Sequence, residues 1–381
     1  MRCCLAYDCL YPWTVGGAEL WYRNLAERLA ADGHEVTYLT RLQWDPADPP
    51  QIPGVRVIAV ARADELYGAD GARRTGPPLR FGAGMLRHLW RHGREYDVVH
   101  LCSFPYFSVL AAAAARRHGR YRLVIDWFEL WTREYWLRYL GAVGGRVGYA
   151  VQQRCVRVRH RAFCFSRLHR DRLVAEGFRG EPTLLAGLLS AGVVAADAPR
   201  AANRTVLYAG RHIAEKRVPA VVAAIAELRR RGSDVGGLIL GDGPERPEVL
   251  AAIDAHGLTG IVSAPGFVSR EEVDDAMARA LCLVQPSERE GYGIVVVEAA
   301  AHGTPVIVAA GPDNAAVELI DPGVNGFVAP SAGASDLADA IAAVDAGGLP
   351  LRTQAAAWFA ANAPTLSVEA SLAAVLAAHR A

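Results

Sequence analysis

Two glutamates, Glu290 and Glu298, flank a Gly-Tyr-Gly turn and an apolar run. The Ala-rich segment that follows predicts a helix beginning near Tyr292, with Glu290 at its N-terminus and Glu298 about two turns further on. Two carboxylates at that spacing could bind the two ends of one ligand. Backbone N–H groups at such a turn favour anions, and Gly291 and Gly293 would let a ligand approach the main chain closely. A phosphorylated sugar carrier would suit both features, and a capped helix with two solvated glutamates is the alternative.

Two cations, Arg211 and Lys216, follow the apolar run at 206–210. A glycine at a strand end, followed by two cations before a helix, suits a diphosphate clamp, because Arg binds in bidentate geometry and Lys acts as a point charge. Gly16 and Gly17 precede the first predicted helix and would expose its first amides to a ligand. Solvated loop cations and a plain strand-to-helix turn are the alternatives for these two motifs.

Two further segments combine turns with aromatic residues. Phe267 and Val268 end a predicted strand and precede a helix, so this turn is either structural or offers backbone edges to a nucleobase. Asp126 and Glu129 lie among aromatic residues just past another apolar strand. Aromatic faces beside carboxylates suit a sugar or an aminated acceptor, and a half-buried aromatic cluster would have the same sequence.

The elements that must position these residues follow an alternating pattern. Short apolar runs alternate with longer helix-like segments, which predicts βα units and parallel sheets. The predicted strands are 3–7, 35–39, 55–60, 97–101, 123–126, 162–165, 205–209, 238–240, 261–263, 282–285 and 306–309. The motifs fall at the carboxyl ends of strands, where doubly wound sheets bind ligands.

A boundary rich in Ala, Asp and Pro at 190–203 divides the 381 residues. We expect an N-terminal Rossmann-like domain at 1–190 and a second at 204–364, with a helix at 365–381 packing back on the first. The fold class is therefore α/β, with two doubly wound domains facing across a cleft. The loops at 43–53 and 66–81 are the expected acceptor loops of the first domain.

Composition limits the function classes. The net charge of +1 gives no electrostatic argument for a nucleic-acid partner. Five of the seven cysteines lie in apolar runs and have no CxxC partner, so they are expected to be buried thiols in a reducing compartment.

The first residues are too short an apolar run for a signal peptide, and the chain is expected in the cytoplasm. Eight arginines within 146–172 form either a solvated helix face or a peripheral contact with the inner face of a membrane.

The ordered combination of Gly16-Gly17, Arg211, Lys216 and Glu290-x7-Glu298 resembles the retaining glycosyltransferases of family 4, and the resemblance spans most of the chain. It implies the GT-B fold. It also implies that Glu290 binds donor-sugar hydroxyls, that Glu298 binds the ribose, and that Arg211 and Lys216 neutralise the diphosphate. Backbone amides at Gly16, Gly17, Gly291, Tyr292 and Gly293 would contact the donor, and Phe267 and Val268 would meet the base.

One departure from that family concerns the first domain. Many members carry a histidine near the reacting sugar carbon, where this chain has Phe128 between Asp126 and Glu129. Our hypothesis is that Asp126 or Glu129 positions the donor or receives the acceptor proton. No metal and no cofactor are expected, because fixed cations would replace a metal.

The resemblance implies transfer of a hexose-like group from a nucleoside diphosphate sugar, with a UDP-sugar as the expected donor, to an acceptor hydroxyl. An aminocyclitol-type natural product and a lipid or polysaccharide precursor of the cell envelope are the two acceptor classes left open. The alternatives are an epimerase or phosphorylase of the same fold, and a non-catalytic nucleotide-sugar-binding protein.

Overall fold

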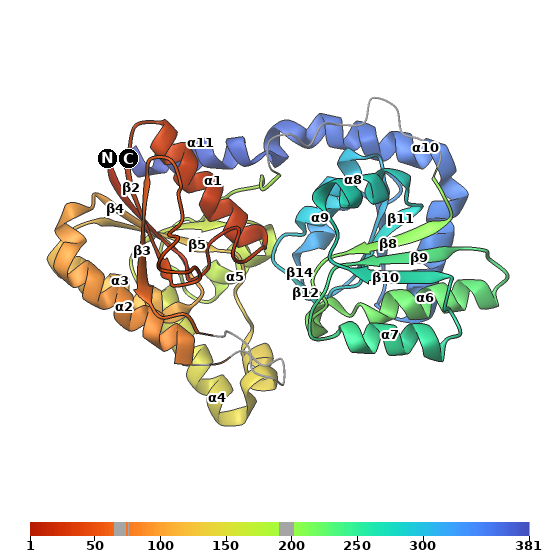
Figure 1. Ribbon diagram of the computed structural model, residues 1–381, viewed down its shortest axis with the longest axis horizontal. Coiled ribbons are helices and arrows are strands. Elements are labelled where there is room, and N and C mark those ends of the chain that lie inside the picture. The colour runs from red at the N-terminus through yellow and green to blue at the C-terminus, as the bar shows by residue number, and fades with distance from the viewer. Residues whose placement is uncertain (65–73, 75, 190–201, 381) are drawn as a thin grey trace. The chain divides into compact units, whose positions relative to one another are not determined.

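The computed structural model describes residues 1–64, 74, 76–189 and 202–380. The chain divides into two compact units (Figure 1). Unit 1 comprises Met1–Leu188 and Val368–Ala381, and unit 2 comprises Leu189–Ser367. Most of the boundary expected at 190–203, and much of the acceptor loop expected at 66–81, lie outside the described residues.

Unit 1 is built on a parallel sheet with the strand order β3-β2-β1-β4-β5-β6-β7. Its central strands are apolar on both faces because helices cover both sides of the sheet. The strands are β1 (Arg2–Ala6), β2 (Glu35–Arg41), β3 (Val55–Ala61), β4 (Val98–Cys102), β5 (Arg122–Trp127), β6 (Arg161–Cys164) and β7 (Thr183–Leu184). Every named pairing is parallel, so the carboxyl ends of the strands share one edge.

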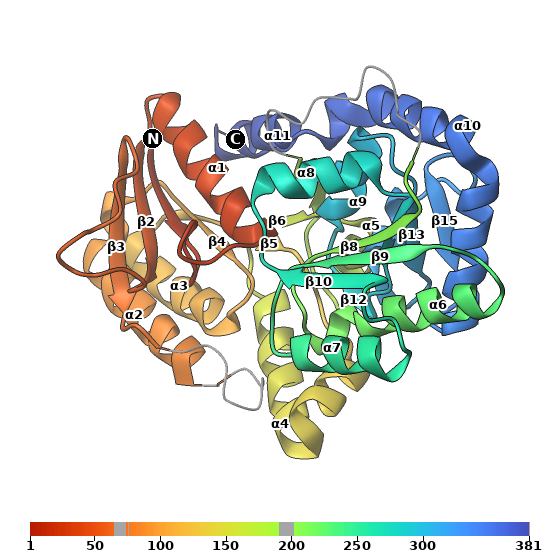
Figure 2. The same ribbon diagram turned by 45° about the vertical axis from the view of Figure 1, so that its right-hand side comes forward.

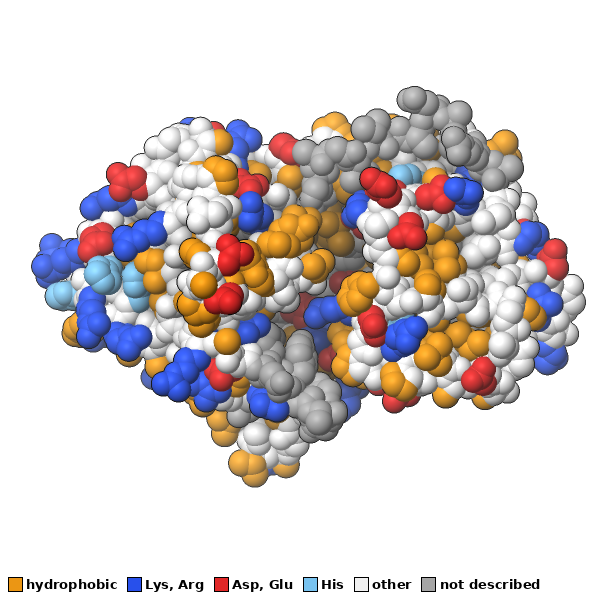
Figure 3. Space-filling model, viewed as in Figure 1, with side chains coloured by type: hydrophobic (Ala, Val, Ile, Leu, Met, Phe, Trp, Pro, Cys, Tyr) orange, Lys and Arg blue, Asp and Glu red, His pale blue; other side chains and the backbone are white. Residues whose placement is uncertain are grey.

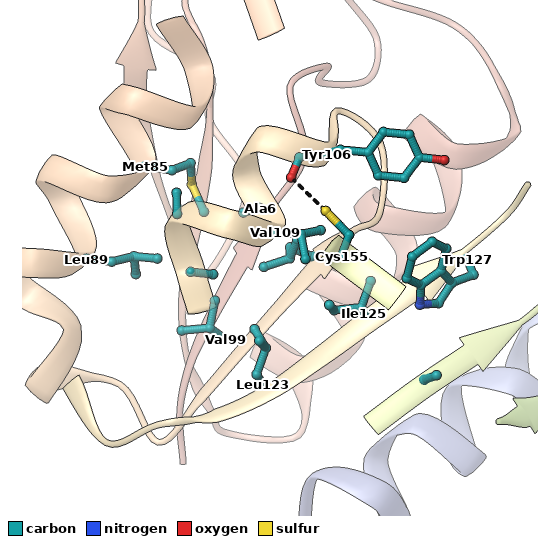
Figure 4. Packing of buried hydrophobic residues seen from close by; sticks show 14 of the residues in the cluster. Ala6, Met85, Leu89, Val99, Tyr106, Val109, Leu123, Ile125, Trp127 and Cys155 are labelled. Atoms are coloured by element: carbon teal, nitrogen blue, oxygen red, sulfur yellow. Dashed lines mark hydrogen bonds between the residues drawn. The ribbon is translucent and has the colours of Figure 1, made fainter. Parts of the chain in front are cut away.

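The helices of unit 1 lie on both faces of this sheet (Figures 1 and 2). They are α1 (Gly17–Ala31), α2 (Gly76–His92), η1 (Gly93–Glu95), α3 (Tyr106–Gly119), α4 (Arg133–Val156), α5 (Arg167–Ala175) and α11 (Val368–Arg380). A core cluster joins Met85 of α2, Val109 of α3 and Cys155 of α4 to Val99 and Ile125 of the sheet (Figure 4). Helix α11 contacts α1 on unit 1.

Unit 2 repeats the plan with a six-stranded parallel sheet in the order β10-β9-β8-β11-β13-β15. These strands are β8 (Thr205–Ala209), β9 (Gly236–Leu240), β10 (Val262–Gly266), β11 (Cys282–Gln285), β13 (Val306–Ala309) and β15 (Gly326–Ala329). A separate pair is formed by β12 (Arg289–Glu290) and β14 (Asp313–Asn314).

Two hydrophobic clusters cover the two faces of the unit 2 sheet. One joins alternate strand residues to α6 and α10, and the other joins the opposite residues to α8 and α9. The helices are η2 (Ala214–Lys216), α6 (Pro219–Arg230), α7 (Arg246–Ala255), α8 (Arg270–Arg279), α9 (Ile294–Ala301), η3 (Ala315–Leu319) and α10 (Ala334–Leu366). Each unit is therefore a doubly wound α/β domain.

All of the predicted strands are present, and the buried state predicted for five cysteines is confirmed. Cys9 and Cys155 are buried as well. The helix predicted to begin near Tyr292 begins at Ile294 instead, because Gly293 is its N-cap in a left-handed conformation. In the described ranges, no helix combines the length and the apolar character needed to cross a membrane.

Candidate functional site

Glu290 is central to the candidate site of unit 2. It lies in β12, which pairs with β14, and the prediction that it sits at the N-terminus of α9 is therefore wrong. Its carboxylate pairs with Lys216 Nζ and accepts a hydrogen bond from Gln285 Nε2 at 2.7 Å. The Lys216 and Glu290 side chains are 17% and 15% exposed, so the pair is mostly buried yet remains accessible to a ligand.

The segment that carries Lys216 follows β8 and lies close to the end of β9. Gly241 has a φ of 114°, and a Cβ there would lie 1.9 Å from the Gly210 carbonyl oxygen, so this close approach of two strand ends requires glycine. The chain then forms the short 3₁₀ helix η2, which ends at Lys216. Arg211 and Lys216 consequently both follow the carboxyl end of β8, as the sequence predicts for a ligand site.

Ion pairs join the η2 segment to β12. Arg289 pairs with Glu215 at 3.2 Å, and Arg217 pairs with Glu288 at 2.9 Å. The Glu288 N–H also donates to the Glu215 carbonyl at 2.8 Å. These contacts fix the two segments that carry Lys216 and Glu290.

The backbone that borders β12 and β14 is held by a side chain that the sequence did not indicate. Asn314 is 3% exposed and donates through Nδ2 to the carbonyls of Ala309, at 2.8 Å, and Ser287, at 3.2 Å. Its Oδ1 accepts from the Ala316 N–H at 3.1 Å. A Cβ at Gly293 would lie 2.7 Å from the Ala316 Cβ, so Asn314 and the turn between β12 and α9 pack on the same segment. Gly291 and Tyr292, like Gly293, are buried there.

Glu298 lies on α9 and forms an ion pair with Arg270, with 2.6 Å between Nη1 and Oε1. Arg270 is the first residue of α8, which Ser269 caps in a capping box with Glu272. Three residues before Arg270, the Phe267 side chain is 75% exposed, while Val268 packs against the core. Glu298 is thus joined through Arg270 to the loop that the sequence assigned to a nucleobase.

The charges around the site are set by burial and by their neighbours. Burial, together with the Glu290 carboxylate, raises the pKa of Tyr208, so its hydroxyl stays protonated and donates to the Arg211 carbonyl at 2.9 Å. Burial, assisted by the charge of Arg246, lowers the pKa of His212, which favours the neutral ring. Burial opposes the charge of Arg270, but Glu298 and Asp274 nevertheless raise its pKa.

Gly16 and Gly17 are where the sequence placed them, at the start of α1. Gly16 is the N-cap, and a Cβ there would lie 2.5 Å from Glu19 Oε2. The Glu19 carboxylate thus lies against the helix start, which favours negative charge. Gly17 has no atom within 4 Å of an added Cβ, so this glycine is not required by packing.

Asp126 and Glu129 are in different environments at the end of β5. Asp126 is completely buried: Oδ1 bonds His100 Nε2 at 2.7 Å, and Oδ2 accepts from Trp21 Nε1 at 2.8 Å. A carboxylate without solvent access does not face a substrate, so we do not retain Asp126 among the groups that touch reactants. Glu129 is half-buried and accepts from Trp131 Nε1 at 3.0 Å.

Three side chains of the unit 2 site were missed by sequence reasoning: Gln285, Arg270 and Asn314. Gln285 could have been found, because it ends β11 at the edge where the other site residues lie. Among the described residues there is no group of three or more His, Cys, Asp or Glu side chains placed to hold a metal ion.

The chain matches two family descriptions, "Glycosyl transferase 4-like domain" over residues 16–187 and "Glycosyl transferases group 1" over residues 196–355. It is 39% identical to the alpha-D-kanosaminyltransferase of Streptomyces kanamyceticus over 136 residues. This match covers 36% of this chain and about a third (35%) of that relative's length. The 2-deoxystreptamine glucosyltransferase of the same organism is 36% identical over 28% of each chain. Glycogen synthase of Mycobacterium tuberculosis is 28% identical over 78% of this chain and 75% of that relative.

Two solved structures resemble the whole chain. Sucrose-phosphate synthase from Thermosynechococcus elongatus has a TM-score of 0.81 at 20% identity and covers 100% of this chain and 98% of its own. An Anabaena protein in complex with UDP has a TM-score of 0.75 at 19% identity and covers 99% of both chains. Two doubly wound units of this kind define the GT-B class of fold. Because the two family matches together extend from residue 16 to residue 355, the chain belongs to the family-4 type of glycosyltransferases, a class of transferase enzymes.

Proposed function

We propose that this protein transfers a hexose-like group from a nucleoside diphosphate sugar to an acceptor hydroxyl, with retention at the anomeric carbon. The observation that carries the proposal is the cluster of Glu290, Lys216 and Gln285 at the carboxyl ends of β8 and β11. It combines a hydrogen-bond acceptor for sugar hydroxyls with a cation for phosphate. UDP is the proposed nucleotide, supported by the Anabaena structure that contains it.

In the proposed reaction, the bond between the anomeric carbon and the diphosphate breaks while the acceptor oxygen bonds to the same face of that carbon. The acceptor proton passes to the departing diphosphate. Arg211 and Lys216 stabilise the negative charge that develops there, and preorganised cations of this kind act most strongly in the transition state. Glu290 orients the sugar, Glu298 binds the ribose, and Phe267 lies against the base.

The acceptor is proposed to be a natural-product or cell-envelope precursor. The kanosaminyl and 2-deoxystreptamine transferases among the relatives favour the first class, but each match covers only about a third of either chain. An expected peripheral membrane contact through the basic 146–172 region would favour the second.

The test is a thermal-shift series with UDP, GDP, ADP, dTDP and their sugar conjugates, since a ligand that binds the native state stabilises it by mass action. We expect UDP and a UDP-sugar to give the largest shifts. The Glu298→Gln variant should bind UDP about tenfold more weakly, because it loses a charge-assisted hydrogen bond. The absence of a shift with every nucleotide would overturn the proposal.

A further inference from the structure

Unit 1 contains an apolar cavity of about 360 Å³ that has no part in the proposed donor site. Its wall includes Phe104, Tyr106, Phe107, Trp131, Trp136 and Tyr139. Phe104 follows the carboxyl end of β4, and Trp131 follows the carboxyl end of β5. The cavity therefore opens at the sheet edge where doubly wound domains bind ligands, and its volume lies in the range of small-molecule sites.

Three residues of this aromatic wall, Tyr106, Trp131 and Trp136, have their polar side-chain atoms hydrogen-bonded to Gln152 and Glu129, which do not line the cavity. The completely buried Gln152 accepts through Oε1 from Tyr106 Oη at 2.8 Å and from Trp136 Nε1 at 3.0 Å. Its Nε2 donates to the Trp131 carbonyl at 2.8 Å, and Glu129 accepts from the Trp131 indole at 3.0 Å. The rings consequently present their apolar faces to the cavity.

The shape of the cavity depends on glycines in α4. This helix breaks at Gly141, where φ is 71°, so its first turns fold against the rest. A Cβ at Gly148 would lie 2.5 Å from the Trp136 ring, and one at Gly145 would lie 2.5 Å from the Trp136 carbonyl oxygen. These glycines let Trp136 lie directly on the helix, which forms one wall of the cavity.

Apolar side chains continue from the cavity onto the surface. Leu140 and Val147 line the cavity and are 37% and 59% exposed, and Val143, which is not part of the wall, is 75% exposed. Figure 3 shows hydrophobic side chains gathered at the end of unit 1 that α4 forms. A ligand in this cavity could therefore extend into solvent past Leu140 and Val147.

We propose that this cavity binds an apolar acyl or aryl part of the acceptor, an inference that rests on the proposed transfer function. The cavity lies beside Glu129 and Trp131, in the segment assigned to the acceptor from sequence. A bare aminocyclitol would lose hydrogen bonds to water there without replacement, which is unfavourable. An alkyl chain or an aromatic aglycone would instead gain apolar burial and ring contacts. The hydroxyl that receives the sugar belongs to a polar group of the acceptor, which is attached to that apolar part.

The test measures binding of methyl, hexyl, octyl and decyl β-glucosides below their micelle concentrations, by calorimetry and by the change in intrinsic tryptophan fluorescence, to which Trp131 and Trp136 contribute. We expect affinity to rise by about fourfold for each methylene until the cavity is filled. Val147→Asp should weaken octyl glucoside binding at least tenfold. Val143→Asp is the matched control, because it adds the same charge one turn away on the same helix but outside the cavity.

Sedimentation with phosphatidylcholine–phosphatidylglycerol vesicles separates the two sources of an apolar group. Chain-length-dependent binding with vesicle binding that Val147→Asp abolishes supports a membrane lipid as acceptor. The same chain-length dependence without vesicle binding supports a soluble aglycone. Affinities independent of chain length, or equal losses in both variants, overturn the inference. The UDP shift, measured on the same proteins, reports separately whether the proposed donor function holds.

Discussion

At the scale of single residues, the site of unit 2 depends on one ion pair that has two uses. In the ligand-free protein, Lys216 pairs with Glu290, and both side chains are mostly buried. A donor diphosphate would compete for Lys216, and the donor sugar would compete for Glu290. Each charge is therefore compensated by the other until the diphosphate replaces Glu290 as the partner of Lys216 and the sugar replaces Lys216 as the partner of Glu290. This exchange avoids the cost of a buried unpaired charge.

We predict that Lys216→Ala lowers kcat by about 10²- to 10³-fold, because it removes a preorganised cation from the developing phosphate charge. Arg230→Ala is the control: its side chain is 73% exposed in an ion pair with Glu227, and such a surface pair contributes at most about 1 kcal/mol. Steady-state kinetics of the two variants make the comparison. Equal rates for Lys216→Ala and the native enzyme would remove Lys216 from the mechanism.

At the scale of elements, the two-residue strands β12 and β14 show why part of the site was not predictable. An apolar run such as Val306–Ala309 predicts a strand. The strands Arg289–Glu290 and Asp313–Asn314 are polar and only two residues long, so the sequence gives no such signal for them. They pair because Asn314 fixes the neighbouring backbone through three hydrogen bonds. Arg270 was missed for a similar reason, since its contact with Glu298 joins residues 28 positions apart.

We predict that Asn314→Ala lowers the melting temperature by roughly 2–10 °C, because buried backbone groups lose their partners. The rate should fall further than this loss of stability explains, since β14 is the partner of the strand that holds Glu290. Asn362→Ala, which loses one bond to the Trp358 carbonyl in α10, is the matched control. Thermal melts of both variants measure the loss of stability, and steady-state kinetics of both measure the loss of rate. A normal rate in Asn314→Ala would mean that β14 does not position Glu290.

At the scale of the whole molecule, the alternation of apolar runs was sufficient to predict two doubly wound sheets. It did not predict which polar side chains would be buried. Asp126 is the next-to-last residue of β5 and is followed by Trp127 and Phe128, a sequence pattern that fits an exposed site as well as a buried one. Its partners, Trp21 and His100, are 105 and 26 residues away, and only the folded chain brings them together.

This buried network joins the first helix, α1, to the last helix, α11, through β4 and β5. His100 of β4 bonds both Asp126 and, at 3.0 Å, His379 of α11. Burial, reinforced by His100, Arg122, His34 and Arg161, lowers the pKa of His379 to about 2. The folded protein thus holds His379 neutral, whereas in the unfolded chain it gains a proton below about pH 6.5.

Because the unfolded chain binds this proton and the folded chain does not, the free energy of unfolding falls as pH drops below about 6.5. Each pH unit below that value costs about 1.4 kcal/mol for this one group. We predict that between pH 7 and pH 5 the native protein loses about 2 kcal/mol more than His379→Asn does. Burial also lowers the pKa of His160 to about 4. Its contribution to the pH dependence of the free energy of unfolding is the same in both proteins and cancels in the comparison. The exposed His256→Asn serves as the control in thermal melts across this range. Parallel pH profiles for the native protein and His379→Asn would show that α11 packs on unit 1 without a neutral His379.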